Sequence, residues 1–276
     1  MIELHDVYFA YGAGQPPAVA GVTFSVEPRD FLVILGRNGS GKSTLAKLIS
    51  GVLRPTQGTV RIAGRDTKET SYLNSIRRTV SLMLSDPESQ IVSPLVEEDV
   101  AFGPENLGLT TEETERRVGE ALDAVGLLGR RTALTDFLSG GEKQRLAIAG
   151  LLAMQTPYMV LDEPTSMLDT EARQGILDLL AELNRHQGVG IVMTSHRAEE
   201  AAWARRVLIL EDGRIKALGS PEAILENQGL LAESGIDSPA LQRLAAALKL
   251  RGFNFTRPIM KTEEMVGELC RSVCKR

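Results

Sequence analysis

The sequence predicts an α/β protein built on a doubly wound parallel sheet, with a β-rich N-terminal part, a helical insertion and a small helical C-terminal appendage. Two observations support this prediction. Strand-like and helix-like patterns alternate over about 220 residues, as they do where helices cover a parallel sheet. Strand-like patterns then stop after Ser220 and Pro221. We therefore expect a main domain at 1–220, with its insertion at about 93–156, and an appendage at 221–276.

The first strands and the first helix follow from short apolar runs near the N-terminus. IELHDVYFAY, AVAGVTFSVEP and DFLVILG are three strand-like runs, and FLVIL is apolar at every position. Such a run is typical of a strand buried on both faces. GKSTLAKLISGV follows it directly and predicts a helix with Leu45, Leu48 and Ile49 on one side. TVRIAG, residues 59–64, predicts a further strand.

Helical signals dominate between residues 93 and 156. Thr110 and Glu113 have the spacing of a capping box, which predicts a helix start. Val118, Leu122 and Val125 follow at helical spacing, and Gly126 ends that helix.

Strands return at YMVLD (158–162) and GIVMTSH (190–196), separated by a helix over 172–188. VLILEDGRIKALG predicts a hairpin that turns at Asp212 and Gly213. In the appendage, Ser238 and Pro239 predict a cap and a first-turn proline. That helix ends at Gly252, and a second begins at Thr262.

The bulk composition excludes several classes of protein. The 276 residues have a net charge of −5 and no long basic run, which argues against nucleic acid as a partner. No signal-peptide pattern opens the chain, and no apolar run reaches the roughly 18–20 residues of a membrane span. Cys270 and Cys274 lack further ligands for zinc, and we interpret them as small apolar residues on a packed helix face. These features predict a cytoplasmic protein.

A glycine-rich turn joins the buried FLVIL strand to the helix after it. Residues 36–43, GRNGSGKS, satisfy G-x-x-x-x-G-K-[ST] at the strand-to-helix position that this motif requires. In such a loop backbone N–H groups surround phosphates, the lysine contacts the β- and γ-phosphates, and the serine hydroxyl ligates Mg²⁺. The alternative is a glycine-rich turn without a ligand. We predict a nucleotide site formed by Gly36, Arg37, Asn38, Gly39, Ser40, Gly41, Lys42, Ser43 and Thr44.

Two adjacent acids end the YMVLD strand. Asp162 is suited to hold Mg²⁺ beside the phosphate loop. Glu163 is suited to accept a proton from an attacking water, the alternative being that it only caps the following turn.

LSGGEKQR, residues 138–145, predicts a second anion site in the same domain. It places Ser139, Gly140 and Gly141 before a helix, whose first N–H groups are free and whose dipole is positive at that end.

The phosphate loop, LSGGEKQR, LDEP and TSH, in this order, resemble the ATP-binding cassette (ABC) family of P-loop NTPases. The resemblance covers residues 1–220 and implies ATP and Mg²⁺ as cofactors. It also implies a dimer in which Ser139, Gly140, Gly141 and Glu142 of each chain act on the ATP of the other. The second ATPase is either an identical copy or a related paralogue.

Other positions of that family correspond to single residues here. Tyr11 resembles the aromatic residue that stacks on adenine, unless it is an ordinary tyrosine at a strand end. Asp169 resembles the residue that links the two sites across the dimer. His196 resembles the switch histidine that contacts the γ-phosphate and orients Glu163, so Glu163 and His196 are the expected catalytic residues.

SDPESQIVSPLVEEDVAFGPENLGL, residues 85–109, resembles a narrower group, the energy-coupling factor ATPases. This resemblance implies ATP hydrolysis that drives uptake of a vitamin or a transition-metal ion. It implies a peripheral position at the cytoplasmic face of the cell membrane, with a transmembrane coupling protein and a membrane substrate-capture subunit as partners. The appendage is then expected to help hold the two ATPases together.

One position departs from the family pattern. Leu84 and Ser85 stand where the family usually has Phe-Gln, and that glutamine contacts Mg²⁺ and senses the membrane partner. Gln90 lies in the region expected to face the coupling subunit. We hypothesise that Gln90 or a water supplies the missing contact, with slower turnover. The alternative is that Ser85 is neutral.

Two other classes of P-loop protein fit less well. Cassette ATPases that act outside transport, in DNA repair, chromosome organisation or translation, would need a coiled-coil insertion, zinc-binding cysteines or a second cassette. P-loop kinases lack LSGG and would need a pocket for an acceptor substrate.

Overall fold

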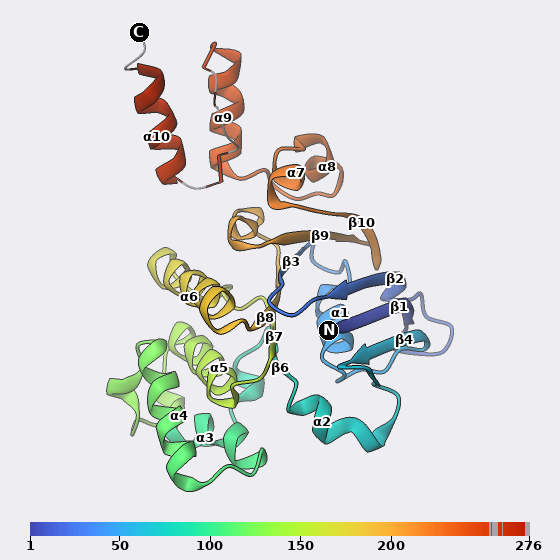
Figure 1. Ribbon diagram of the computed structural model, residues 1–276, viewed down its shortest axis with the longest axis vertical. Coiled ribbons are helices and arrows are strands. Elements are labelled where there is room, and N and C mark those ends of the chain that lie inside the picture. Colours follow the sequence, from blue (N-terminus) through green and yellow to red (C-terminus); the bar gives the residue numbers. More distant parts are fainter. Residues whose placement is uncertain (254, 256–258, 261, 274–276) are drawn as a thin grey trace.

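A computed structural model of the chain describes residues 1–253, 255, 259–260 and 262–273. Its centre is a six-stranded sheet in the order β10-β9-β3-β8-β7-β6, parallel except for the β9–β10 hairpin (Figure 1). The strands are β3 (Phe31–Leu35), β6 (Val80–Met83), β7 (Tyr158–Asp162), β8 (Gly190–Ser195), β9 (Arg206–Glu211) and β10 (Arg214–Gly219). The prediction that FLVIL is buried on both faces is confirmed, because all five β3 residues are buried.

A second, antiparallel sheet forms the predicted β-rich N-terminal part. Its order is β2-β1-β4-β5, with β1 (Ile2–Phe9), β2 (Val19–Val26), β4 (Gln57–Ile62) and β5 (Arg65–Asp66). Together with α1 (Lys42–Ile49) it packs on the face of the central sheet that presents Leu32 and Ile34. The strand predicted at 59–64 ends earlier than expected, because Ala63 and Gly64 turn the chain into β5 with positive φ angles of 50° and 77°.

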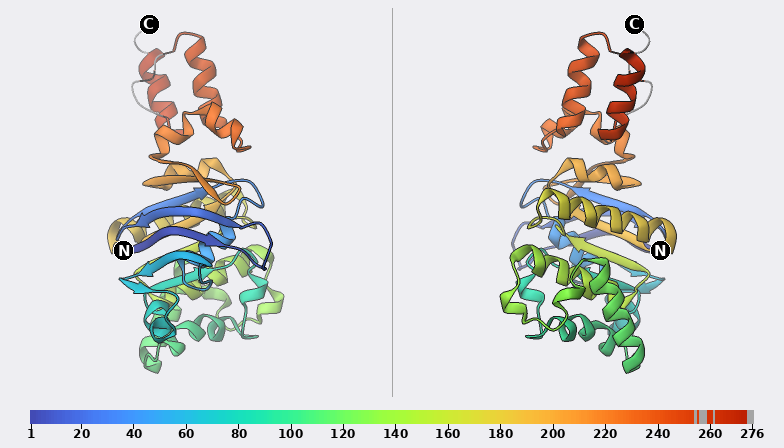
Figure 2. Two further views of the ribbon diagram at one scale, coloured as in Figure 1. Left: turned by 90° about the vertical axis from the view of Figure 1, so that its right-hand side faces the viewer. Right: turned by 90° about the vertical axis from the view of Figure 1, so that its left-hand side faces the viewer.

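Helices cover the opposite face of the central sheet (Figure 2). α5 (Gly140–Met154) and α6 (Thr170–Glu182) lie on this face, whereas α3 (Val96–Asn106) and α4 (Thr111–Ala124) pack against α5; α3, α4 and α5 form the predicted insertion. The predicted helix start at Thr110 is confirmed, since its Oγ1 accepts a hydrogen bond from Glu113 N at 3.4 Å, but the Glu113 carboxylate bonds to Arg116 and Arg117 instead of completing the capping box. The sequence did not predict strand β6 or α2 (Leu73–Arg77).

In its described residues, the C-terminal segment contains four helices, two of them not predicted. They are α7 (Pro221–Leu225), α8 (Gln228–Glu233), α9 (Ala240–Leu250) and α10 (Thr262–Val273). The short α7 and α8 add Ile224, Leu225 and Leu231 to the main core, whereas α9 and α10 extend from it with a small cluster of their own (Figure 1). The domain boundary at residue 220 therefore stays a prediction.

The cap of α9 and the cysteine on α10 differ from what the sequence predicts. The N-cap of α9 is Pro239, one residue later than predicted, and no side chain caps it. Cys270 is exposed rather than packed, because it lies on the outer side of α10, and Cys274 lies outside the described residues. No helix in the described part of the chain combines the length and the apolar character that a membrane span requires.

Candidate functional site

The phosphate loop lies where β3 ends and α1 begins. A Cβ atom on Gly36 would lie 2.4 Å from the carbonyl oxygen of Leu210, so only glycine fits this close approach. Gly41 has φ of +102°, and a Cβ there would lie 2.3 Å from the carbonyl oxygen of Ala18. These two glycines let the loop fold tightly, and the first N–H groups of α1 have no acceptor within the helix. The loop is therefore suited to surround phosphate oxygens.

Lys42 is the first residue of α1 and points into this loop. Its Nζ donates hydrogen bonds to the carbonyl oxygens of Gly36 at 2.9 Å and Arg37 at 3.1 Å. Burial lowers the pKa of Lys42, and the charges of Glu163 and Asp162 partly offset that effect. The two hydrogen-bond acceptors of the ammonium group are neutral carbonyl oxygens, so it is well placed to exchange them for charged phosphate oxygens, which form stronger hydrogen bonds.

The carboxyl end of β7 lies two strands from β3, with β8 between them, and it places the two predicted acids near Lys42. The Glu163 Oε1 atom lies 3.6 Å from Lys42 Nζ. Asp162 is only 1% exposed, and its Oδ1 accepts a hydrogen bond from Thr194 Oγ1 at 2.5 Å. Glu163 N donates to the same hydroxyl oxygen at 3.0 Å. Thr194, on β8, thus fixes both acids, and sequence reasoning missed it.

His196 directly follows β8 and completes this group. Its Nδ1 lies 3.3 Å from Glu163 Oε2, and its side chain is 44% exposed. The two oxygens of Glu163 are thus flanked by Lys42 on one side and His196 on the other. The structure brings the predicted catalytic residues together because β3, β8 and β7 are neighbouring parallel strands whose carboxyl ends share one edge.

Tyr11 follows β1 and is 61% exposed. Its ring packs edge-on against Phe9, and its hydroxyl shares a hydrogen bond with Thr44 Oγ1 at 3.0 Å. The ring is therefore fixed to the helix that follows the phosphate loop, with its surface open to a planar ligand.

The LSGG segment caps α5. Ser139 and Glu142 form a reciprocal capping box, in which Glu142 Oε2 accepts from Ser139 N and from Ser139 Oγ, both at 2.9 Å. These bonds lower the pKa of Glu142. Gly140 and Gly141 approach Met167 and Leu168 rather than the phosphate loop, within the part of the chain described. The second predicted anion site is thus separate from the first.

Asp169 and Gln144 lie next to these two regions. Asp169 lies just after Leu168 and is the N-cap of α6, where its Oδ1 accepts from Ala172 N at 2.8 Å. Gln144 lies on α5 and is fully buried; its Nε2 donates to the carbonyl oxygen of Glu163 at 3.0 Å. Sequence reasoning did not single out Gln144. The sequence offered one sign of its role: Gln144 is a polar residue on the side of α5 that otherwise carries buried apolar side chains.

Ser85 and Gln90 follow β6. Ser85 is exposed, whereas the amide of Gln90 is engaged with the backbone: its Oε1 accepts from Leu84 N at 2.7 Å and its Nε2 donates to Leu82 O at 3.4 Å. Gln90 therefore anchors the segment in which Ser85 lies. For Gln90 to supply a metal contact, as hypothesised, these bonds would have to break.

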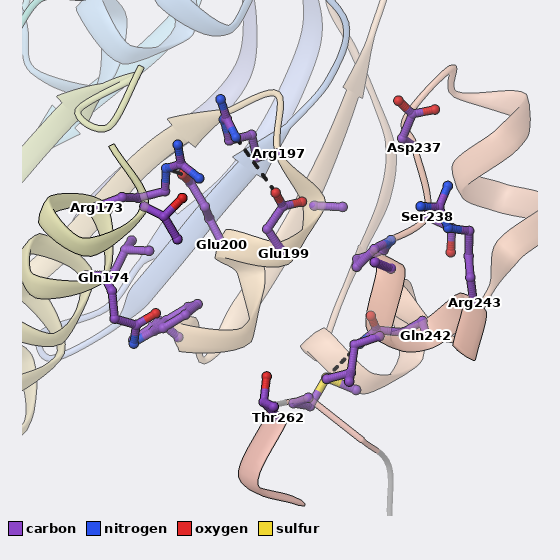
Figure 3. Close-up of a pocket in the computed structure, with 18 of the residues that line it drawn as sticks. Arg173, Gln174, Arg197, Glu199, Glu200, Asp237, Ser238, Gln242, Arg243 and Thr262 are labelled. Carbon is purple, nitrogen blue, oxygen red and sulfur yellow. Dashed lines mark hydrogen bonds and ion pairs between the residues drawn. The ribbon is translucent and has the colours of Figure 1, made fainter. Parts of the chain in front are cut away.

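A cavity of about 930 Å³ lies between α6 and the segment 196–203 on one side and the start of α9 on the other. In Figure 3, Arg173 on α6 lies with Glu199 and Glu200 on one side of the cavity, and Gln242 and Arg243 on α9 lie on the other. Glu200 is 1% exposed; burial raises its pKa, and Thr165 Oγ1 donates a hydrogen bond to it at 2.5 Å. Because both acidic and basic side chains line the cavity, its charge favours neither an anionic nor a cationic ligand.

Comparison with known proteins identifies what this chain is similar to. Residues 19–166 match the family described as ABC transporter. The energy-coupling factor transporter ATP-binding protein EcfA of Syntrophomonas wolfei is 40% identical over 273 residues, which cover 99% of this chain and 100% of that protein.

Two solved structures resemble the fold. One is the dimeric post-hydrolysis state of the ATP-binding cassette MJ0796 bound to ADP and Pi, with a TM-score of 0.75, 28% identity, and coverage of 80% of this chain and 99% of that one. The other is CbiO1 of Clostridium perfringens, described as part of the ABC transporter complex CbiONQ. It has a TM-score of 0.74, 28% identity, and coverage of 89% of this chain and 98% of that one.

Proposed function

Because this chain belongs to the ABC transporter family, and within it to the energy-coupling factor ATP-binding proteins, we propose that it works in pairs, at composite sites shared by two chains. It is an ATP-binding, ATP-hydrolysing subunit of such a transporter. The observation that supports composite sites most directly is the separation of its two anion sites. Lys42, Glu163 and His196 converge at one sheet edge, whereas Ser139–Gly141 lie against Met167 and Leu168.

In this proposal Glu163 is the general base for hydrolysis. Lys42 exchanges its carbonyl partners for the β- and γ-phosphates of ATP, which leaves Glu163 beside the attacking water. One Glu163 oxygen accepts the water proton while the water oxygen bonds to the γ-phosphorus, and the bond from that phosphorus to the β–γ bridging oxygen breaks, giving ADP and phosphate. His196, at 3.3 Å from the other oxygen, keeps the carboxylate oriented.

Ser43 and Asp162 are the residues that would hold Mg²⁺. A hydroxyl and a carboxylate are the hard oxygen donors that this ion prefers, and the remaining ligands would come from phosphates and water. Among the described residues, no cluster of three or more His, Cys, Asp and Glu side chains could hold a metal ion. The ion would neutralise the phosphate charge that develops in hydrolysis.

The LSGG segment would close the site of the partner chain. Ser139 and Gly140 are exposed at the N-terminus of a 15-residue helix, where free N–H groups and the helix dipole favour a phosphate anion. In the dimer, Ser139, Gly140 and Gly141 would contact the γ-phosphate bound to the other copy, with Glu142 holding the turn. Asp169 would then lie between the two sites.

We place the protein peripherally at the cytoplasmic face of the membrane, where it would drive uptake of a vitamin or transition-metal ion. A groove of about 570 Å³ between α3 and α4 supports a docking site for a transmembrane coupling protein, since Glu98, Phe102 and Glu105 line it. A substrate-capture subunit would bind that protein in turn. On the appendage, Leu244, Leu250 and Val266 are exposed apolar side chains that support contact with the second ATPase.

The decisive variant is Glu163→Gln, which removes the base and keeps the shape of the side chain. We expect turnover to be lost and an ATP-bound dimer to accumulate, visible by size-exclusion chromatography with MgATP. Glu199→Gln, a nearby exposed carboxylate, is the matched control and should turn over normally. A Glu163→Gln protein that stays monomeric with MgATP would contradict composite sites. Association with membranes should disappear when the multipass partner is deleted.

A further inference from the structure

Gln144 is the only residue of the LSGGEKQR segment that is fully buried with both ends of its side chain engaged, among the described residues. It is 0% exposed on α5, four residues into the helix. Its Nε2 donates to Glu163 O at 3.0 Å, and its Oε1 accepts from Met167 N at 3.2 Å. Since a buried amide without partners is costly, these two bonds fix α5 relative to the segment from Glu163 to Met167.

The backbone of Glu163 needs this support. Its φ is +52°, a left-handed conformation that a residue with a side chain adopts only when its surroundings hold it there. Thr194 Oγ1 binds the N–H of Glu163 and Gln144 Nε2 binds its carbonyl oxygen, so the residue is held on both sides. A change at either bond would rotate the carboxylate away from Lys42 and His196.

The same helix presents the LSGG segment at its N-terminus. The positions of Gly140 and Gly141 are 3.5 Å from Met167 Sδ and Met167 O, measured from a Cβ built on each glycine. Met167 is also bound by Gln144. The segment that would contact the partner's nucleotide and the base that acts on the chain's own nucleotide are therefore joined by one short, buried set of contacts.

We infer that Gln144 is a positioning residue for Glu163 of its own chain. When α5 of one chain docks on the ATP bound to the partner, Gln144 of that first chain orients Glu163 of the same first chain. The inference rests on the proposed function. When the LSGG segment seats on the neighbouring nucleotide, α5 becomes fixed, and the bond from Gln144 to the Glu163 carbonyl holds the carboxylate toward its water. Hydrolysis at one site is then coupled to the seating of the chain at the other.

The first test is Gln144→Met, which keeps length and helix propensity and removes both hydrogen bonds. Because a small displacement of a catalytic group can lower the rate by about 100-fold, we expect kcat to fall by roughly 10- to 100-fold, with KM for ATP within about twofold. Gln174→Met is the matched control, since that exposed glutamine donates a hydrogen bond to Asp178 on the same helix and touches neither Glu163 nor Met167 among the described contacts. An unchanged kcat for Gln144→Met, or equal losses in both variants, would overturn the inference.

A second test uses pairs of differently tagged copies, purified as mixed dimers, in which Glu163→Gln silences one site. With Gln144→Met on the copy that retains Glu163, we expect the rate to fall as in the first test. With Gln144→Met on the copy that already carries Glu163→Gln, we expect no slowing. The rate should equal that of the mixed dimer in which Gln144 is intact in both copies. Equal slowing in both arrangements would mean a general loss of structure and would overturn the inference. Copies that both carry Glu163→Gln test the proposed function separately, because their activity must be absent.

Discussion

Thr194→Val isolates the hydroxyl group that fixes both active-site acids. Valine has nearly the shape of threonine, so the packing of β8 is kept while two hydrogen bonds are lost. One is the bond from Thr194 Oγ1 to Asp162 Oδ1 at 2.5 Å, and the other is the bond from Glu163 N to Thr194 Oγ1 at 3.0 Å. Thr194 is fully buried, and Asp162 is 1% exposed, so water cannot replace the lost hydroxyl freely.

The magnitude follows from the two groups left unpaired. Each buried polar group without its partner costs about 1–3 kcal/mol, so the free energy of unfolding should fall by about 2–6 kcal/mol. For a chain of this size each kcal/mol lowers Tm by roughly 2–4 °C, which predicts a loss of at least about 4 °C. The turnover number should also fall, because the left-handed backbone of Glu163 loses one of its two anchors.

Calorimetry and steady-state ATPase rates would test this prediction, with Thr194→Ser as the matched control. Serine keeps the hydroxyl and loses only a methyl group, so its Tm should be lowered by much less and its turnover should be retained. The reasoning would be refuted if the valine and serine variants had the same Tm and the same kcat.

Three further predictions concern single side chains. Lys42→Ala should abolish ATP binding in isothermal titration calorimetry, because the loop loses its only buried cation among the described residues; retained affinity would contradict its role. Ser85→Gln should raise turnover severalfold by restoring a longer oxygen donor, and an unchanged ATPase rate would leave the serine neutral. Glu200 has a folded-state pKa raised above 4.5 by burial, so stability is lost as pH rises from 4.5 through that pKa. The Glu200→Gln variant has no carboxyl group to titrate, so the difference between its Tm and that of the wild type should grow in favour of the variant as pH rises from 4.5 through the pKa of Glu200. A difference in Tm that stays constant with pH would argue against the buried charge.

Local patterns predicted most of the elements that hold the site. The run FLVIL, the glycines at 36 and 41 and the helix after them follow from burial and from backbone conformation, which are local properties. The cap at Thr110 and the turn at Asp212 and Gly213 were likewise predicted, because each depends on neighbouring residues only. Strand β6 and the short helices α7 and α8 were missed, since their few residues are stabilised by packing on the main core.

The residues that carry the chemistry of the site could be assigned from residue type and spacing, whereas the residues that hold them in place could not. Lys42, Glu163 and His196 belong to recognisable motifs. Thr194 and Gln144 do not reveal their roles in the sequence, because each bonds to a residue far away along the chain: Thr194 to Asp162, and Gln144 to the Glu163 carbonyl.

The sequence by itself thus determined which residues can bind phosphate, which can accept a proton and where the longer helices and most strands lie. Only the tertiary structure decided the strand order, which places β8 between β3 and β7. That order brings the Glu163 carboxylate to 3.6 Å from Lys42 Nζ and to 3.3 Å from His196 Nδ1. The physical reason is that parallel strands are joined by crossover connections and pair through contacts between residues far apart in the sequence. Local sequence patterns therefore do not specify which strands become neighbours.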